Sequence, residues 1–283
     1  MTKTIAASAA LFLLTAVSVS AGRMEKDTKR IEAHGVETVE VNIDFAIGEI
    51  TLLPKDQSDV AVIELDYDPR QFDYDIEYVA RNDRGFLDIE SMQRRKRDLD
   101  SEDNLLEVTL STRYPMELVL DVGACDAEFD FTGIPLTDIS MDIGAASGTI
   151  EFAEPNPVRL ERFDVDAGAS SVEFESLGNA NFEVFNFSGG AGSFDLDLRG
   201  KYEGESRVMI DVGVGSADII VPEGIPVRVE ADRDGWLSSV DFHGDDMEEV
   251  DDDVYETDDF EDAETRLIIE IDVGLGSVDL YWR

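Results

Sequence analysis

Residues 211–221 read DVGVGSADIIV, and residues 272–282 read DVGLGSVDLYW. The same phrase occurs earlier as DVGACDAEFDF from Asp121, DIGAASGTIEF from Asp142, DAGASSVEFE from Asp166 and SGGAGSFDLDL from Ser188, with a weaker copy, DFAIGEITLL, from Asp44. Most copies recur with a period of roughly 22 residues, which predicts a solenoid, a β-unit stacked on copies of itself.

Within each phrase, apolar and acidic residues alternate after the glycines. Six residues after the first glycine of the phrase, the residue is apolar in six copies. Five residues after that glycine it is mostly acidic: Glu128, Thr149, Glu173, Asp195, Asp218 and Asp279. This period of two predicts a strand with one buried and one exposed face. The glycines precede that strand. They are expected where a turn needs a positive φ, or where stacked backbones approach too closely for a Cβ.

The segments between the phrases, residues 136–143, 159–167 and 182–187, also have strand patterns, so each coil is expected to contain two or more short strands. The predicted fold is all-β: a right-handed β-solenoid with an N-terminal β cap, closed by the final strand. Six aromatic residues fall on the inward rows and are predicted to form core: Phe129, Phe131, Phe152, Phe174, Phe194 and Trp282.

The two ends of the chain depart from the repeat. Residues 1–21 have the pattern of a signal peptide, with Lys3, an apolar run and the cleavage motif Val19-Ser20-Ala21; an uncleaved anchor is the alternative. Residues 22–114 are predicted to form the cap, including an exposed loop at 93–104. Residues 115–283 are predicted to form the solenoid, with an acidic insert at 245–264. No later segment is apolar enough to span a bilayer, so we expect an exported protein, periplasmic or extracellular at the cell surface.

The chain has a formal net charge of −42, with 65 acidic against 23 basic residues. Such a field repels nucleic acid and anionic lipid, and it favours cationic partners: divalent metals, basic peptides or basic patches of an envelope protein. Adaptation to a saline habitat is the alternative explanation. The oligomeric state stays open at this stage.

Calcium is the metal that the sequence suggests, because hard cations prefer several carboxylate oxygens. The candidate ligands are the aspartates of the insert: Asp245, Asp246, Asp251, Asp252, Asp253, Asp258 and Asp259. A second acidic feature is the ladder predicted from one aspartate per coil: Asp121, Asp142, Asp166, Asp211 and Asp272. The alternative is a solvated acidic loop, with ladder side chains that accept backbone hydrogen bonds. Neither an EF-hand loop nor a calcium-binding nonapeptide is present.

No catalytic constellation is evident, and no other cofactor is expected. His34 and His243 lie far apart and have no nearby Cys or His in the sequence, which argues against a zinc site or a catalytic triad. Cys125 occupies a repeat position that otherwise contains Gly, Ala or Ser, so we expect a buried structural residue. Arg and Lys are sparse along the repeats. A lyase or glycosidase on a solenoid is kept as an alternative function.

Two stretches carry a resemblance to known families. The run YPMELVLDVG from Tyr114 with GIPLTDISMDIGAASGTIEF from Gly133 resembles the toastrack β-solenoid domains of bacterial envelope proteins. DVGVGSADIIVPEGIPVRVEA from Asp211, followed after an acidic gap by LIIEIDVGLGSVDLYW, is similar to the C-terminal domain of the cell-wall-active antibiotics response (LiaF-like) family. Adhesin-like solenoids share the glycine rhythm. The resemblance implies a non-catalytic binding or scaffold module of the envelope, or an accessory in cell-envelope stress sensing.

Overall fold

The computed structural model describes residues 24–94, 104–232, 238–244, 247–257 and 259–283. The predicted signal peptide lies outside these ranges, as do most of the predicted loop at 93–104 and three aspartates of the acidic insert. Within the described residues the chain is almost entirely β, with a short 3-10 helix, η2 (Leu177–Ala180).

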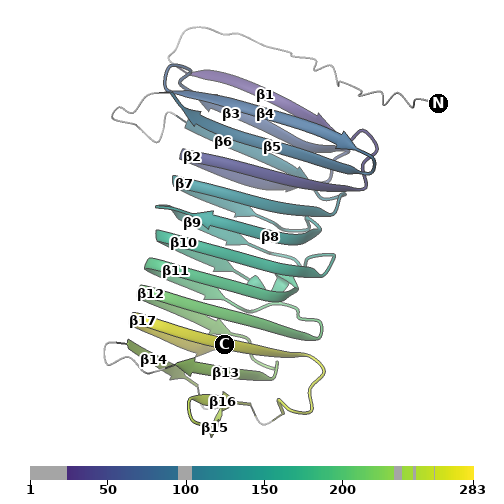
Figure 1. The fold of residues 1–283 in the computed structure, drawn as a ribbon. Coiled ribbons are helices and arrows are strands. Elements are labelled where there is room, and N and C mark those ends of the chain that lie inside the picture. Colours follow the sequence, from purple (N-terminus) through teal and green to yellow (C-terminus); the bar gives the residue numbers. More distant parts are fainter. Residues whose placement is uncertain (1–23, 95–103, 233–237, 245–246, 258) are drawn as a thin grey trace, which may run out of the picture.

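Long parallel strands stacked along one axis form the body of the molecule (Figure 1). They are β2 (Thr38–Lys55), β7 (Met116–Asp130), β10 (Leu160–Glu175), β11 (Phe182–Asp197), β12 (Glu205–Val221) and β17 (Arg266–Trp282), with β8 (Leu136–Ile143) and β9 (Ser147–Glu151) sharing one level. The repeats pair in register, so that Asp166 lies opposite Asp142 and Asp272 opposite Asp211. The predicted β-solenoid is confirmed.

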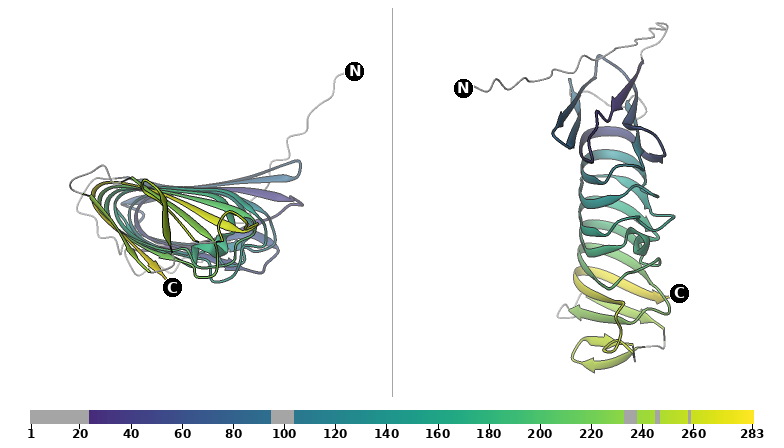
Figure 2. Two further views of the ribbon diagram at one scale, coloured as in Figure 1. Left: turned by 90° about the horizontal axis from the view of Figure 1, so that it is seen from below. Right: turned by 90° about the vertical axis from the view of Figure 1, so that its right-hand side faces the viewer.

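Each coil has two broad faces joined at a narrow edge that contains the glycines. Figure 2 (left), a view along the stack, shows the coils as a flattened ring. We call the outward side chains before the glycines face A and those after them face B. The strands differ from the expected short segments, because in all these coils except the β8–β9 level one strand continues through the glycines from face A to face B. The strands stay continuous because each one pairs with its neighbour both before and after the glycines, as β12 does with β11 and β17.

The final strand is an inner coil rather than the closing one. β17 pairs with β12 on one side, and on the other with β13 (Val227–Asp232) and β14 (Ser238–His243). The chain therefore passes to the end of the stack and returns to fill the preceding level. The expectation that the last strand closes the solenoid is corrected, because the glycine phrase of β17 matches that of β12 in register.

The N-terminal end is built in a similar way. β2 carries the weak copy of the phrase and is itself a coil, with β7 on one side and β5 (Arg84–Gln93) and β6 (Asn104–Ser111) on the other. Beyond them, β4 (Phe72–Arg81) pairs with β5, β3 (Asp59–Tyr67) with β6, and β1 (Glu25–Glu32) with β3, all antiparallel. These outer strands form the N-terminal end in Figure 2 (right).

The core is a column of aromatic and aliphatic side chains between the two faces. All five predicted core phenylalanines are at most 1% exposed, whereas Trp282 is partly buried. Rings contact one another from coil to coil, as in Phe163–Phe185 at 5.1 Å between centroids, and within one coil, as in Phe187–Phe194 at 4.9 Å. Cys125 is buried as expected, and burial raises the pKa of its thiol to about 11, so it is a weak nucleophile.

At the glycine edge, neighbouring backbones pack against each other without room for side chains. Gly215 and Gly276 lie side by side with φ of 145° and 153°. A Cβ on Gly276 would overlap the carbonyl oxygen of Gly215, and one on Gly274 would lie 2.7 Å from that of Gly213. Both predicted reasons for glycine, positive φ and close approach, therefore apply at this edge.

Candidate functional site

Rows of carboxylates cross the broad faces, one side chain per coil. The predicted ladder on face A lies in register and is exposed, extends to Asp44 on β2, and is interrupted by Ser188 on β11. On face B the corresponding row includes Asp195, Asp218 and Asp279 on β11, β12 and β17. Burial first, and then the charges of Asp195 and Asp279, raise the pKa of Asp218. The rows thus concentrate like charge at strand spacing.

The face A ladder runs into an open groove of about 500 Å³ near the C-terminal end of the stack. Strands β11, β12, β17 and β13 form its floor. Its wall comes from the hairpin of β15 (Glu248–Asp251) and β16 (Val254–Glu256), which pairs with β13. Six acidic residues line the groove: Asp211, Glu230, Asp252, Asp253, Glu270 and Asp272. The groove therefore joins two acidic features that are separate in the sequence, the ladder and the insert.

The groove combines this charge with an apolar patch. Met209 on the floor is 38% exposed and Val254 on the wall is partly exposed. None of the described lining residues is Lys, Arg or His. An arrangement of this kind suits a ligand with an alkyl stem and a cationic head, such as a lysine or arginine side chain.

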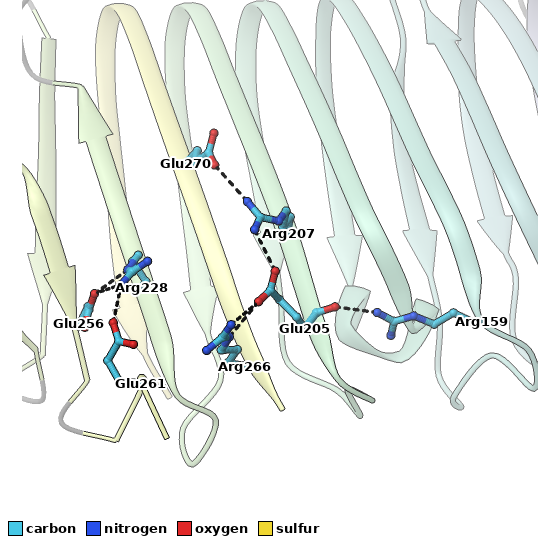
Figure 3. Close-up of polar contacts among 8 residues, drawn as sticks. All are labelled: Arg159, Glu205, Arg207, Arg228, Glu256, Glu261, Arg266 and Glu270. Carbon is cyan, nitrogen blue, oxygen red and sulfur yellow. Dashed lines mark hydrogen bonds and ion pairs between the residues drawn. The ribbon is translucent and has the colours of Figure 1, made fainter. Parts of the chain in front are cut away.

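Ion pairs hold the hairpin wall in place (Figure 3). Arg228 on β13 donates to Glu256 on β16 at 2.6 Å and to Glu261 at 3.1 Å. Its guanidinium also lies over the ring of Phe260 at 4.5 Å. The backbone contributes as well, since the amide of Ala231 donates to the carbonyl oxygen of Asp253 at 3.0 Å.

A second group of ion pairs secures β17 against β12 (Figure 3). Arg266 donates twice to Glu205, at 2.7 and 2.9 Å, and Arg207 donates to Glu205 at 2.9 Å. Arg159 reaches the carbonyl oxygen of Glu205 at 2.8 Å. The hydrogen bond from Arg266 is the main reason why the pKa of Glu205 is lowered. The sequence shows Arg and Lys only as sparse along the repeats, but the structure brings Arg159, Arg207 and Arg266 together at Glu205.

The predicted calcium ligands are only partly described. Asp251, Asp252 and Asp253 lie at the hairpin turn, where the Asp251 carboxylate accepts the amide of Asp252 at 2.8 Å, and Asp259 is exposed. Asp245, Asp246 and Asp258 lie outside the described residues. Among the described residues, no group of three or more His, Cys, Asp or Glu side chains is placed to hold a metal ion. Calcium binding stays a prediction.

The two histidines lie at opposite ends of the stack. His34 stacks against Tyr78 with 6.2 Å between centroids. His243 on β14 stacks on Tyr281 at 4.6 Å, and its Nε2 is 2.7 Å from a carboxylate oxygen of Asp279. Both contacts of His243 join β14 to β17, so this histidine links the terminal coil to the inserted strand.

The groove itself could not have been found from the sequence. Its floor combines strands that are distant in the chain, because β17 enters between β12 and β13. The usable signals were the ladder aspartates and the acidic insert, and nothing in their spacing indicated that they meet.

Two family profiles match this chain. Residues 20–161, about half of the chain, match the N-terminal domain of toast_rack, DUF2154. Residues 173–280 match the C-terminal domain described as cell wall-active antibiotics response LiaF. No curated protein sequence matches the chain. In the described residues, the structure contains no helix with the length and hydrophobicity needed to span a bilayer.

Two solved structures align with most of this chain at low sequence identity. A candidate cell adhesion protein of Clostridium sporogenes is 17% identical, with a TM-score of 0.50 over 92% of this chain and 100% of that chain. A candidate adhesin of Bacteroides fragilis is 7% identical, with a TM-score of 0.41 over 91% of this chain and 97% of that chain. The first supports the fold. Neither matched family is described as an enzyme family.

Proposed function

We propose a function from one premise: this chain belongs to the toast_rack family, with a C-terminal region of the LiaF type. On that premise, the protein is an exported, non-catalytic module of the cell envelope. It binds a cationic partner, a basic segment of a protein, through its acidic surface, and the groove at the C-terminal end is the principal contact.

The observation that carries this proposal is the set of unpaired acids in the groove. Within the described part of the chain, the side chains of Asp211, Glu230, Asp252 and Asp272 have no ion-pair partner, and all four residues are exposed. The acids surround the exposed thioether of Met209. A bound lysine or arginine would therefore pair its charge with the carboxylates and pack its alkyl stem against Met209. A carbohydrate-active enzyme would need exposed aromatic rings on which a sugar can stack. Phe187 is the one aromatic among the described lining residues, and it is 1% exposed, which supports a non-catalytic role.

Binding of a labelled nonapeptide of alternating lysine and arginine, followed by fluorescence anisotropy, tests the proposal. The triple variant Glu230→Gln, Asp252→Asn, Asp272→Asn removes three carboxylates of the groove. At about 0.15 M salt we expect it to lose about tenfold in affinity, from three exposed pairs of about 0.5 kcal/mol each.

The matched control removes three charges from the face A ladder, outside the groove: Asp121→Asn, Asp142→Asn, Asp166→Asn. It should change the affinity by less than about threefold, because the Debye length of about 8 Å screens these distant charges. An equal loss in both variants would show that binding follows the overall charge and that the groove has no special role.

A second candidate role is that of an accessory in envelope-stress sensing. The LiaF-type match covers residues 173–280 and therefore includes all the lining residues of the groove. The test is a chromosomal copy of the groove triple variant in a strain with an envelope-stress reporter, challenged with a cell-wall antibiotic. A changed reporter response supports this role. A response equal to wild type, with the protein present at normal level, argues against it.

The proposed export can be tested separately. A fusion of residues 1–21 to a reporter enzyme that is active only outside the cytoplasm should give activity. Deletion of those residues from the full protein should leave it in the cytoplasmic fraction. Fractionation of the intact protein between periplasm, envelope and medium then identifies its final location.

A further inference from the structure

We propose that the groove receives the basic run Arg94-Arg95-Lys96-Arg97 of a second copy of this chain, so that two copies pair antiparallel. The proposal rests on the proposed function in one respect, the preference of the groove for cations. It goes beyond that function because it names the occupant and gives the protein a defined assembly.

The groove selects for a partner with several adjacent positive charges. Its acids come from three strands, β12, β13 and β17, and from the hairpin turn, and they are spread over about 500 Å³ rather than converging on one point. Glu270 is held by Arg207 at 4.0 Å, and Asp253 has interactions of its own. The four remaining acids lie along the groove, so an extended cationic segment matches them better than a single ion does.

The chain contains one such segment. Residues 94–97 are the only place in the sequence where more than two basic residues follow one another. The run begins where β5 ends at Gln93, at the N-terminal end of the stack. Arg94 has a side-chain exposure of 52% and pairs with Asp73 on the neighbouring strand β4. Residues 95–97 lie outside the described ranges and enter here by their sequence alone.

The run cannot reach the groove of its own chain. β5 and β12, the strand of Asp211, are separated by six strand spacings through β2, β7, β8, β10 and β11, which is about 29 Å. Arg97 lies four residues beyond Gln93, and a fully extended chain spans about 14 Å over that length. The occupant must therefore come from another molecule, and a second copy provides it.

Antiparallel pairing follows from where the two elements lie. Strand β5, which Arg94 follows, lies toward the N-terminal end of the stack, and the strands that form the floor of the groove lie toward the C-terminal end (Figure 1). A two-fold axis across the solenoid brings each run to the partner's groove, which satisfies two equivalent contacts at once. In an open head-to-tail arrangement, each pair of molecules would form only one contact between a run and a groove. Like-charge repulsion between the copies is long-ranged and is screened beyond about 8 Å at about 0.15 M salt, whereas close ion pairs are screened less.

Sedimentation velocity of the purified full chain over a concentration series tests the pairing. We expect a concentration-dependent dimer at about 0.15 M salt. The groove variant Glu230→Gln, Asp252→Asn, Asp272→Asn and the run variant Arg95→Gln, Lys96→Gln, Arg97→Gln should each weaken dimerisation by about tenfold or more. Far-ultraviolet circular dichroism verifies that both variants remain folded.

Charge-matched controls separate a specific contact from overall charge. The ladder variant Asp121→Asn, Asp142→Asn, Asp166→Asn matches the groove variant, and Lys26→Gln, Lys29→Gln, Arg30→Gln on β1 matches the run variant at the same end of the stack. Both should stay within about threefold of the wild type. A reciprocal swap should restore the dimer: Arg95→Glu, Lys96→Glu, Arg97→Glu combined with Glu230→Lys, Asp252→Lys, Asp272→Lys.

Several outcomes would overturn the pairing. They are a wild-type protein that stays monomeric up to about 1 mM, controls that weaken the dimer as much as the variants do, or a swap that fails to restore it while each half remains folded. A monomer whose groove still binds the basic nonapeptide would refute the self-pairing but leave the proposed function standing, with a foreign basic segment as the occupant. Loss of both activities would refute the two together.

Discussion

At the scale of single residues, the glycines of the repeat set how closely the coils can stack. Where the repeat has glycine, the carbonyl oxygen of one coil occupies the place where the next coil's Cβ would be, as at Gly215 and Gly276. Cys125, Ala146 and Ser170 occupy the equivalent position in other coils and are all buried. The edge tolerates small side chains only where the local backbone leaves space for them.

Substitution of Gly276 by alanine is expected to destabilise the protein by about 2–4 kcal/mol, because it adds steric overlap to an unfavourable φ. Gly35→Ala is the matched control: Gly35 also has a positive φ, of 80°, but nothing lies within 4 Å of its Cβ position. It should cost about 1 kcal/mol. Urea unfolding measures both, and equal costs would show that φ alone, and not close stacking, requires glycine here.

Arg266 carries a second prediction at this scale. Its pair with Glu205 is only partly exposed, with side-chain exposures of 30% and 34%, and its guanidinium lies 5.2 Å from the ring of Phe260. Arg266→Gln should therefore cost about 1–2 kcal/mol of unfolding free energy. Lys201→Gln, which breaks the more exposed pair with Glu203, should cost less than about 0.5 kcal/mol. If the two variants unfold alike, the arginine does not secure β17.

At the scale of elements, the insertion of β17 organises the C-terminal end. It pairs over its whole length with β12, and it supports β13 and β14 on its other side. The segment between β14 and β17 is thereby held close to face A, where its hairpin becomes the wall of the groove. A strand order that followed the sequence would have left the hairpin with no such position.

The carboxylate rows predict an unusual pH dependence. Burial, reinforced by neighbouring acids, raises the pKa of Asp44 and Glu151, and burial is also the main reason for the raised pKa of Asp138 and Asp218. The folded state therefore binds protons more tightly than the unfolded state at these groups. The corresponding stability is fully present below their ordinary pKa of about 4 and is lost as pH rises through the folded values.

We therefore expect the melting temperature to rise as the pH falls from about 7 toward the ordinary carboxyl pKa of about 4, at constant ionic strength. Glu205 acts in the opposite direction, because its lowered pKa costs stability as pH falls further, through its folded value below 4.5. Calorimetry across this range measures the balance, with Glu151→Gln as the variant that should reduce the gain. A melting temperature that is flat or falls over the whole range from about pH 7 to about pH 4 would contradict the assignment.

At the scale of the whole molecule, charge and shape act against each other. A net charge of −42 is held on a solenoid whose outward rows bring carboxylates into register. Strand pairing and the phenylalanine column must outweigh this repulsion. Salt reduces the repulsion without touching the core, so the stability of the molecule should depend strongly on ionic strength.

Raising sodium chloride from about 0.01 M to about 1 M should increase the melting temperature by several degrees, because the Debye length falls from about 30 to about 3 Å. Calcium chloride at equal ionic strength tests the predicted metal site. A further rise specific to calcium is what the calcium prediction requires, since a ligand that binds only the native state stabilises it. Loss of that rise in Asp251→Asn, Asp252→Asn, Asp253→Asn would assign it to the hairpin turn.

The sequence by itself determined the coil. Its alternating apolar and acidic residues, its glycine spacing and its phenylalanine rows follow from local backbone geometry that repeats in every coil, so the β-solenoid, the buried Cys125 and the ladder on face A could all be predicted. The order of the coils could not, because Gly213 and Gly274 carry nearly the same phrase and only long-range pairing decides that β17 lies beside β12. The groove depends on that order: Asp211, Asp252 and Asp272 come together only once β17 is inserted and Arg228 holds the hairpin.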